Sequence, residues 1–186
     1  MTSSFRVVGQ SSVATGGFLR LEGLRIQGPD GAVHERFVVR HPGAVVVVPF
    51  DETDGNVLMI RQYRVAVDAE LLEVPAGKRD VAGEVPEATG RRELEEEVGH
   101  RAQRMVALAE FFNTPGFCDE YTYLYLALGL EPLAQRDTQT AEEHAMQVER
   151  VPLDAALAMI ATREIVDAKT IIGLTLAKAW LDAAGG

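Results

Sequence analysis

The middle of the chain opens with apolar runs that have the length and composition of β-strands. Residues Ala44–Phe50 (AVVVVPF) form a continuous, valine-rich run, which predicts a buried strand. An Asp-Gly turn signal lies in Asp51–Asn56, so Val57–Gln62 is expected to return as a partner strand. Three more strands are expected farther along the chain, at Met105–Phe112, Tyr121–Leu128 and Gln147–Val151.

The first 40 residues alternate short extended stretches with turns. Phe18–Ile26 and Val33–Arg40 have strand-like patterns, and the sequence GPDG at Gly28–Gly31 is a strong turn signal between them. Together these segments predict a β-hairpin, after which Pro42 and Gly43 break the chain. Two parts are therefore expected, an N-terminal β region at 1–40 and a main domain at 41–186.

Helical periodicity begins at Pro86, which suits the first turn of a helix, and Gly99 suits the position just past its end. Gly90, inside this segment, weakens a helix by about 1 kcal/mol relative to alanine. Leu153–Arg163 and Asp167–Leu181 are expected to be amphipathic helices. Strands combined with few helices predict an α+β architecture.

Composition and charge narrow the class of protein. The chain has 186 residues, of which 47% are hydrophobic and 25% charged, which is typical of a globular protein. Its net charge of −10 argues against nucleic-acid binding, because phosphate neutralisation needs a basic face. Neither a signal peptide nor a membrane span is expected, so the chain is predicted to be cytoplasmic. Its one cysteine, Cys118, excludes an intrachain disulfide framework, and nothing indicates that it is a nucleophile.

The acidic excess is concentrated in the expected helix at Pro86–Gly99. Glu93, Glu96 and Glu97 are spaced at i, i+3 and i+4, so on an α-helix they share one face. Like charges at this spacing repel, and a hard divalent cation such as Mg²⁺ would relieve the repulsion. Arg92, four residues before Glu96, is placed to hold that carboxylate in one rotamer. The alternative is a glutamate-rich helix face in contact with solvent.

The residues around this cluster follow a known pattern. The chain resembles the Nudix box, G-x5-E-x7-R-E-U-x-E-E-x-G-U, in which U is aliphatic. Two positions depart from it: six residues rather than five separate Gly77 from Glu84, and His100 replaces the last aliphatic residue. Neither departure removes an expected metal ligand. The matching positions are Glu84, Arg92, Glu93, Leu94, Glu96, Glu97 and Gly99.

The resemblance to the Nudix family implies a fold, a cofactor and a chemistry. It implies a mixed β-sheet sandwiched between α-helices, with an N-terminal antiparallel β extension. It also implies that Glu93, Glu96 and Glu97 bind Mg²⁺, with Mn²⁺ as an alternative, and that the carbonyl of Ala76 completes the site. Glu97 and Arg92 would then belong to the catalytic machinery. The implied substrate class is a nucleoside diphosphate linked to another group.

Two segments outside the box resemble the ADP-ribose pyrophosphatase subfamily. One is Arg61–Arg64 followed by Leu72–Gly77, and the other is Thr114–Glu120, which contains Pro115 fifteen residues past His100. Arginine suits phosphate and nucleobase recognition, although a strand-end arginine on the surface is the simpler interpretation for Arg64. The substrate contacts that this resemblance implies are Arg36, Arg64, Glu73 and Glu120.

A general base and a partner are also implied by the subfamily. The base is expected from the polar loop Glu131–His144, at Glu142 or Glu143, with Glu142 slightly favoured. An exposed acidic loop is the alternative. Related enzymes are homodimers that pair or exchange N-terminal sheets, so the hairpin is expected to dimerise. The alternative is a hairpin that packs on its own domain.

Three functions follow from these interpretations. The first is Mg²⁺-dependent hydrolysis of the pyrophosphate bond of ADP-ribose to AMP and ribose 5-phosphate. The second is hydrolysis of another nucleoside diphosphate sugar, such as GDP-mannose. The third is a non-catalytic Nudix module that binds a nucleotide as a regulator, against which the complete set of three glutamates argues.

Overall fold

The computed structural model describes residues 4–136, 138 and 144–185. Contacts divide the chain into two compact units. The N-terminal unit runs to Gly43 and includes Phe111–Tyr121, and the larger unit contains Ala44–Glu110 and the chain from Thr122 onward. None of the described helices is long and apolar enough to cross a membrane.

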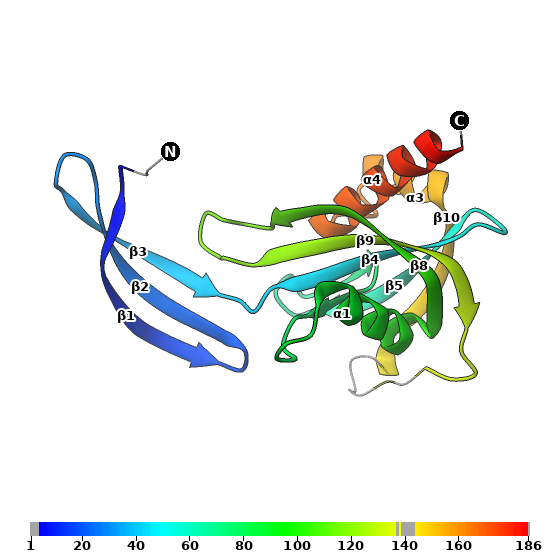
Figure 1. The fold of residues 1–186 in the computed structure, drawn as a ribbon, viewed down its shortest axis with the longest axis horizontal. Coiled ribbons are helices and arrows are strands. Elements are labelled where there is room, and N and C mark those ends of the chain that lie inside the picture. Colours follow the sequence, from blue (N-terminus) through cyan, green and yellow to red (C-terminus); the bar gives the residue numbers. More distant parts are fainter. Residues whose placement is uncertain (1–3, 137, 139–143, 186) are drawn as a thin grey trace. The chain divides into compact units, whose positions relative to one another are not determined.

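The N-terminal unit contains a three-stranded antiparallel sheet, with strands in chain order across it (Figure 1). The predicted hairpin is present as β2 and β3, in which Leu24 pairs with Arg36. The additional strand β1 was not predicted, because its sequence RVVGQSSVATG has a polar centre and lacks a buried face. The strands are β1 (Arg6–Gly16), β2 (Leu19–Gln27) and β3 (Val33–Arg40).

The segment that contains Pro115 joins the end of β3 in this unit. Val39 N donates to Phe117 O at 2.7 Å, and Asp119 N donates to Val39 O at 3.1 Å. Asp119 Oδ1 also accepts from His41 N at 2.8 Å. Arg40 Nη1 reaches Asp119 Oδ2 at 3.0 Å. The chain around Pro115 is therefore hydrogen-bonded to the N-terminal sheet.

In the larger unit, the described residues form a mixed seven-stranded sheet. Its main path has the order β10-β5-β4-β9-β8, while β6 pairs with β5 and β7 pairs with β4. The central strand β4 is parallel to β9 and antiparallel to β5. The strands are β4 (Ala44–Asp51), β5 (Asn56–Arg64), β6 (Ala69–Glu73), β7 (Ala76–Lys78), β8 (His100–Phe112), β9 (Tyr121–Pro132) and β10 (Gln147–Pro152).

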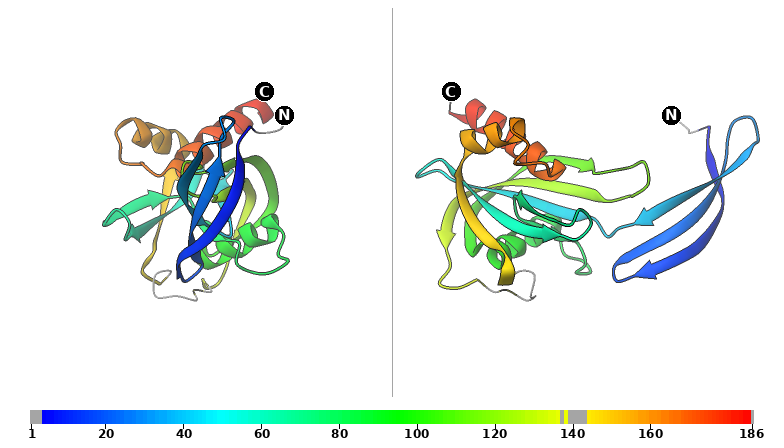
Figure 2. Two further views of the ribbon diagram at one scale, coloured as in Figure 1. Left: turned by 90° about the vertical axis from the view of Figure 1, so that its left-hand side faces the viewer. Right: turned by 180° about the vertical axis from the view of Figure 1, so that it is seen from behind.

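Helices cover both faces of this sheet (Figures 1 and 2). A Cβ on Gly90 of α1 would lie 3.1 Å from the side chains of Val45 and Val47, and one on Gly173 of α4 would lie 2.9 Å from Val48. Because successive side chains of a strand point to opposite faces, α1 and α4 pack on opposite sides of β4. The helices are α1 (Pro86–Glu93), η1 (Leu94–Val98), α3 (Leu153–Ala161) and α4 (Ala168–Ala184).

This close packing explains the glycine that the sequence alone made look unfavourable. Gly90 lets α1 approach β4, whose residues Val45–Val48 are completely buried. The valine-rich run was therefore correctly predicted as a buried strand. The observed α+β architecture agrees with the prediction, including the mixed sheet between helices and the separate N-terminal sheet.

Several predicted element boundaries were wrong. The α-helix expected as far as Val98 ends at Glu93, and Leu94–Val98 form a single π-helical turn instead. Strand β8 begins at His100 rather than Met105, because its polar first residues lie on an edge strand where only part of the chain is buried. Strand β9 continues to Pro132. The short strands β6 and β7 were not predicted.

Candidate active site

The first feature of the site is a close approach between two residues of the Nudix-like motif, Gly77 and Glu93. The carboxylate of Glu93, at the end of α1, lies in the space that a Cβ on Gly77 of β7 would fill. Glu93 is only 9% exposed. A side chain at position 77 would therefore overlap this carboxylate, so the glycine is what lets Glu93 lie against β7.

Arg92 is the centre of an ion-pair cluster with three carboxylates. Its Nη1 lies 2.8 Å from Glu93 Oε1 and 2.9 Å from Glu96 Oε2. Its Nε lies 3.5 Å from Glu84 Oε1. Burial works against the charge of Arg92, but attraction to Glu93 and the other carboxylates outweighs it and raises the pKa of the guanidinium. The Arg92–Glu96 contact expected from the spacing is present.

Glu84 is held by a residue that the sequence did not single out. Thr89 Oγ1, which is completely buried in α1, donates to Glu84 Oε2 at 2.7 Å. Burial opposes ionisation of Glu84, but the hydrogen bonds from Thr89 and Arg92 prevail and lower the pKa of the carboxyl. Glu84 is therefore ionised at neutral pH and orients Arg92.

Glu97 makes a different contact, which depends on the π-helical turn. Its Oε2 accepts from the backbone N of Ala76 at 2.9 Å, and Glu97 is 5% exposed. The wider turn changes the positions of Glu96 and Glu97 relative to Glu93 from those of the predicted α-helix, as such turns often do at functional sites. Gly99 then ends the turn in the left-handed conformation with φ of 72°.

The chemistry of these residues fits a hard divalent cation. The candidate ligand atoms are carboxylate oxygens. Three acidic side chains contact Arg92, and Glu97 adds a fourth carboxylate, so the cluster has a net negative charge. In the described part of the chain, however, no three metal-binding side chains already converge on one point. The carboxylates contact Arg92 and Ala76 N instead. Glu93, Glu96 and Glu97 as metal ligands, with the Ala76 carbonyl, therefore remain a prediction.

Arg64 and Glu73, predicted separately as substrate contacts, bind each other. Arg64 Nε and Nη2 donate to the two oxygens of Glu73 at 2.8 and 2.6 Å. Glu73 is 1% exposed, whereas the Arg64 side chain is 34% exposed. The hydrogen bond to Glu73 outweighs burial and raises the pKa of Arg64. Glu73 therefore orients Arg64, and only Arg64 presents much surface to a ligand.

Two of the other predicted residues belong to the N-terminal unit. They are Arg36, on β3, and Glu120. Arg36 is exposed and its Nη1 donates to Glu35 O at 2.8 Å. Glu142 and Glu143 lie outside the described residues, so the general base stays a prediction.

Other contacts support the site without a signal in the sequence. Arg79, after β7, lies over the ring of Tyr123 at 4.9 Å, and its Nη2 donates to Glu84 O at 3.4 Å. Arg136 Nη1 donates to Glu97 O at 2.9 Å. Tyr123 and Arg136 lie far along the chain from the residues that they contact, and no local pattern identifies these two contacts.

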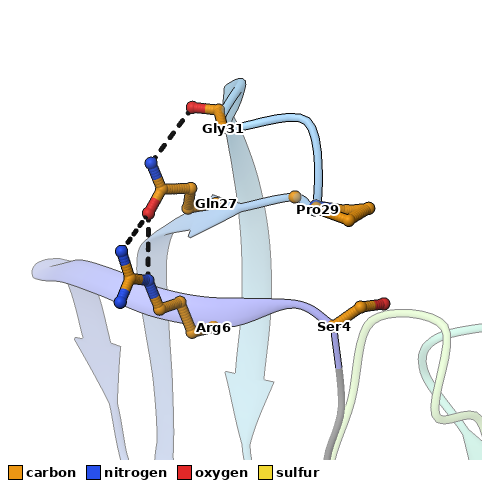
Figure 3. Close-up of a pocket in the computed structure, with 6 residues that line it drawn as sticks. Ser4, Arg6, Gln27, Pro29 and Gly31 are labelled. Atoms are coloured by element: carbon orange, nitrogen blue, oxygen red, sulfur yellow. Dashed lines mark hydrogen bonds between the residues drawn. The ribbon is translucent and has the colours of Figure 1, made fainter.

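A separate hollow lies at one end of the N-terminal sheet (Figure 3). Its polar side chains bind one another: Arg6 Nε and Nη2 both donate to Gln27 Oε1, and Gln27 Nε2 donates to Gly31 O. None of the predicted site residues lines this hollow, and we assign no function to it.

Comparison with known proteins identifies the family. The NUDIX domain family matches residues 39–171. An ADP-ribose pyrophosphatase of Bacillus subtilis (strain 168) is 34% identical, over 89% of this chain and 88% of its own length. An ADP-ribose pyrophosphatase of Mycobacterium tuberculosis is 36% identical, over 91% of this chain and 81% of its own length. A methanol dehydrogenase activator of Bacillus methanolicus is 34% identical, over 91% of this chain and 90% of its own length.

A solved structure supports the same fold. The crystal structure of an ADP compounds hydrolase superposes with a TM-score of 0.85 over 100% of this chain and 98% of that one, at 20% identity. The chain therefore belongs to the Nudix family and is a Nudix hydrolase with the Nudix α+β fold. Members of this family typically depend on a divalent metal ion.

Proposed function

We propose that this Nudix hydrolase cleaves the pyrophosphate bond of ADP-ribose and releases AMP and ribose 5-phosphate, with Mg²⁺ as its cofactor. The observation that carries the proposal is the largely buried set of carboxylates around Arg92, together with the Arg64–Glu73 pair. The carboxylates can hold divalent cations, and Arg64 can bind phosphate. The substrate is supported by two relatives, 34% and 36% identical, that are ADP-ribose pyrophosphatases.

In this proposal Glu93, Glu96, Glu97 and the carbonyl of Ala76 hold the cation. When bound, Mg²⁺ supplies Lewis-acid polarisation of a phosphoryl oxygen and lowers the pKa of a coordinated water. Arg92 keeps the carboxylates in place before binding, because its Nη1 contacts both Glu93 and Glu96. Mn²⁺ has the same preference for oxygen ligands and is the expected substitute.

The remaining residues bind substrate or move a proton. Arg64, held in a fixed orientation by Glu73, binds the diphosphate through its exposed edge. Glu142 or Glu143 accepts a proton from the attacking water. Arg36 and Glu120, in the N-terminal unit, contribute further substrate contacts.

The test is hydrolysis of ADP-ribose, ADP-glucose and GDP-mannose in the presence of Mg²⁺, with the products identified by ³¹P NMR. The proposal predicts the highest kcat/KM for ADP-ribose, with AMP and ribose 5-phosphate as products. GDP-mannose pyrophosphatases are more distant relatives, so a preference for GDP-mannose would contradict the substrate assignment. Binding of ADP-ribose without turnover would favour a regulator instead.

We also propose a homodimer that forms through the N-terminal sheet. Strand β1 is an edge strand, and apolar side chains on the sheet are exposed, among them Val13 at 51% and Phe37 at 54%. Exposed edges and apolar surfaces of this kind favour pairing with another chain. Light scattering after size-exclusion chromatography should give twice the chain mass. Val13→Lys should shift the protein towards monomer, and a monomeric wild type would contradict the proposal.

A further inference from the structure

The backbone between β6 and β7 is fixed by three other elements of the larger unit. Val74 N donates to Thr170 Oγ1 of α4 at 3.1 Å. Pro75 has no N–H to donate, and its carbonyl accepts from Val47 N of β4 at 3.0 Å. Ala76 N donates to Glu97 Oε2 at 2.9 Å. A shift at Val74 is therefore transmitted directly to residues on both sides of it.

Thr170 is completely buried and its hydroxyl has a defined orientation. The hydroxyl donates to Asp167 Oδ2 at 2.9 Å, so its single proton is committed and its lone pairs accept from Val74 N. Asp167 Oδ2 also accepts from Thr170 N at 2.8 Å, which makes Asp167 the N-cap of α4. Asp167 Oδ1 lies 2.8 Å from Lys169 Nζ. The N-terminus of α4 thus presents one oriented acceptor to Val74.

Close packing of α4 holds this acceptor in place. A Cβ on Gly173, one turn after Thr170, would lie 2.9 Å from Val48 Cγ2 and 3.9 Å from Val74 Cγ2. The glycine therefore lets α4 approach both the central strand and the segment that Thr170 binds. Hydrogen bonding and packing fix the same few residues.

We infer that Thr170, oriented by Asp167, is a positioning residue for the reaction, an inference that rests on the proposed function. By fixing Val74, Thr170 holds Glu73 on one side, where it orients Arg64, and Ala76 on the other, where it binds Glu97. Thr170 touches neither Arg64 nor the carboxylate cluster. It acts through the backbone that joins the phosphate-binding residue to the metal-binding residues.

The test replaces the hydroxyl and keeps the shape of the side chain. Thr170→Val leaves Val74 N without its acceptor, whereas Thr170→Ser retains the hydroxyl. Thr175→Val is the matched control, because Thr175 is an exposed threonine of the same helix whose hydroxyl donates only along the helix, to Ile171 O at 2.7 Å. Leu153→Ala, at a buried position of α3 outside residues 73–76, serves as a variant that loses stability.

Three readouts separate positioning from simple stability. For ADP-ribose, kcat/KM of Thr170→Val should fall about 10- to 100-fold, because small displacements of reacting groups have effects of this size. The Kd for Mn²⁺, measured by calorimetry, should rise, and hydrogen exchange of the peptide covering 73–78 should accelerate. Thr170→Ser and Thr175→Val should each stay within about threefold of wild type in kcat/KM. Leu153→Ala should melt earlier and keep its kcat.

Several results would overturn the inference. One is Thr170→Val with wild-type Mn²⁺ affinity and unchanged exchange in 73–78, and another is an equal loss in Thr170→Val and Thr170→Ser. A wild type that fails to hydrolyse ADP-ribose would refute the proposed function instead. Mn²⁺ affinity and local hydrogen exchange would still decide the role of Thr170 in that case.

Discussion

The carboxylate of Glu93 occupies the position that a side chain on Gly77 would take. This relationship joins the strand before the Nudix helix to the first acidic residue of its R-E-U-x-E-E segment. It explains in physical terms why the motif begins with glycine. The requirement is space for a carboxylate, since Gly77 is not among the glycines with positive φ.

Gly77→Ala should therefore displace Glu93 from β7. We expect kcat/KM for ADP-ribose to fall about 100-fold, because the added methyl moves a metal-binding group, and stability to fall by about 1–3 kcal/mol from overpacking. Gly185→Ala is the matched control, since its Cβ would meet its nearest neighbour, Leu181 O, at 3.4 Å. Gly77→Ala with normal activity would show that the position of Glu93 does not matter.

Arg64→Lys should impair substrate binding more than chemistry. Lysine cannot reproduce the two parallel hydrogen bonds to Glu73, so the cation loses its fixed orientation and KM for ADP-ribose should rise roughly tenfold. Because Glu73 is 1% exposed, its weakened pairing should also lower stability by about 1–3 kcal/mol. Thermal unfolding and initial rates measure the two effects.

Arg61→Lys is the control for that variant on the same strand. The Arg61 and Glu149 side chains are 32% and 35% exposed, so their pair should contribute less than about 1 kcal/mol. If Arg61→Lys raised KM as much as Arg64→Lys does, a specific role for Arg64 in substrate binding would be excluded.

The turn between β4 and β5 should give the protein an acid-sensitive contribution to stability. Hydrogen bonds from Thr53, and then from Arg150, lower the pKa of Asp51 to about 2, below its ordinary value of 3.8. A depressed folded-state pKa contributes stability above pH 4 that is lost as pH falls towards 2. Asp51→Asn should cost about 1 kcal/mol at pH 7 after solvent screening.

Urea unfolding of wild type and Asp51→Asn at several pH values measures this contribution. The difference between the two proteins should shrink as pH falls from about 5 to about 2, because Asp51 takes up its proton near pH 3.8 in the unfolded state but only near pH 2 in the folded state. A difference independent of pH would contradict the assignment.

Much of the fold was accessible to sequence reasoning because its signals are local. The run Ala44–Phe50 is buried on both faces of the sheet, and the pattern of Phe18–Arg40 contains a strong turn. Strand β1 was not predicted because it lacks a buried face. The start of β8 was not predicted because its first residues are polar and lie on an edge strand. Strands β6 and β7 are short and defined by their partners in the sheet.

The candidate site likewise combines contacts that the sequence predicts with contacts that it does not. The spacing of Arg92 and Glu96 is local, and their contact was predictable. The π-helical turn that contains Glu97 was not predicted, and its contacts include hydrogen bonds with distant residues such as Arg136, which no local pattern indicates. Likewise, Thr170 lies 96 residues from Val74 in the chain, so no periodicity indicates their hydrogen bond.

The most direct test of the account is a Mg²⁺ titration of ADP-ribose hydrolysis by wild type, Glu97→Gln and Glu95→Gln. Glu97→Gln keeps an acceptor for Ala76 N and removes the charge, so kcat/KM should fall roughly 10²- to 10³-fold. Glu95, in the same turn, pairs with exposed Arg101, and Glu95→Gln should behave as wild type. Two results would contradict a metal-dependent Nudix mechanism centred on Glu97: wild-type activity that does not change with Mg²⁺ concentration, or activity of Glu97→Gln equal to that of wild type.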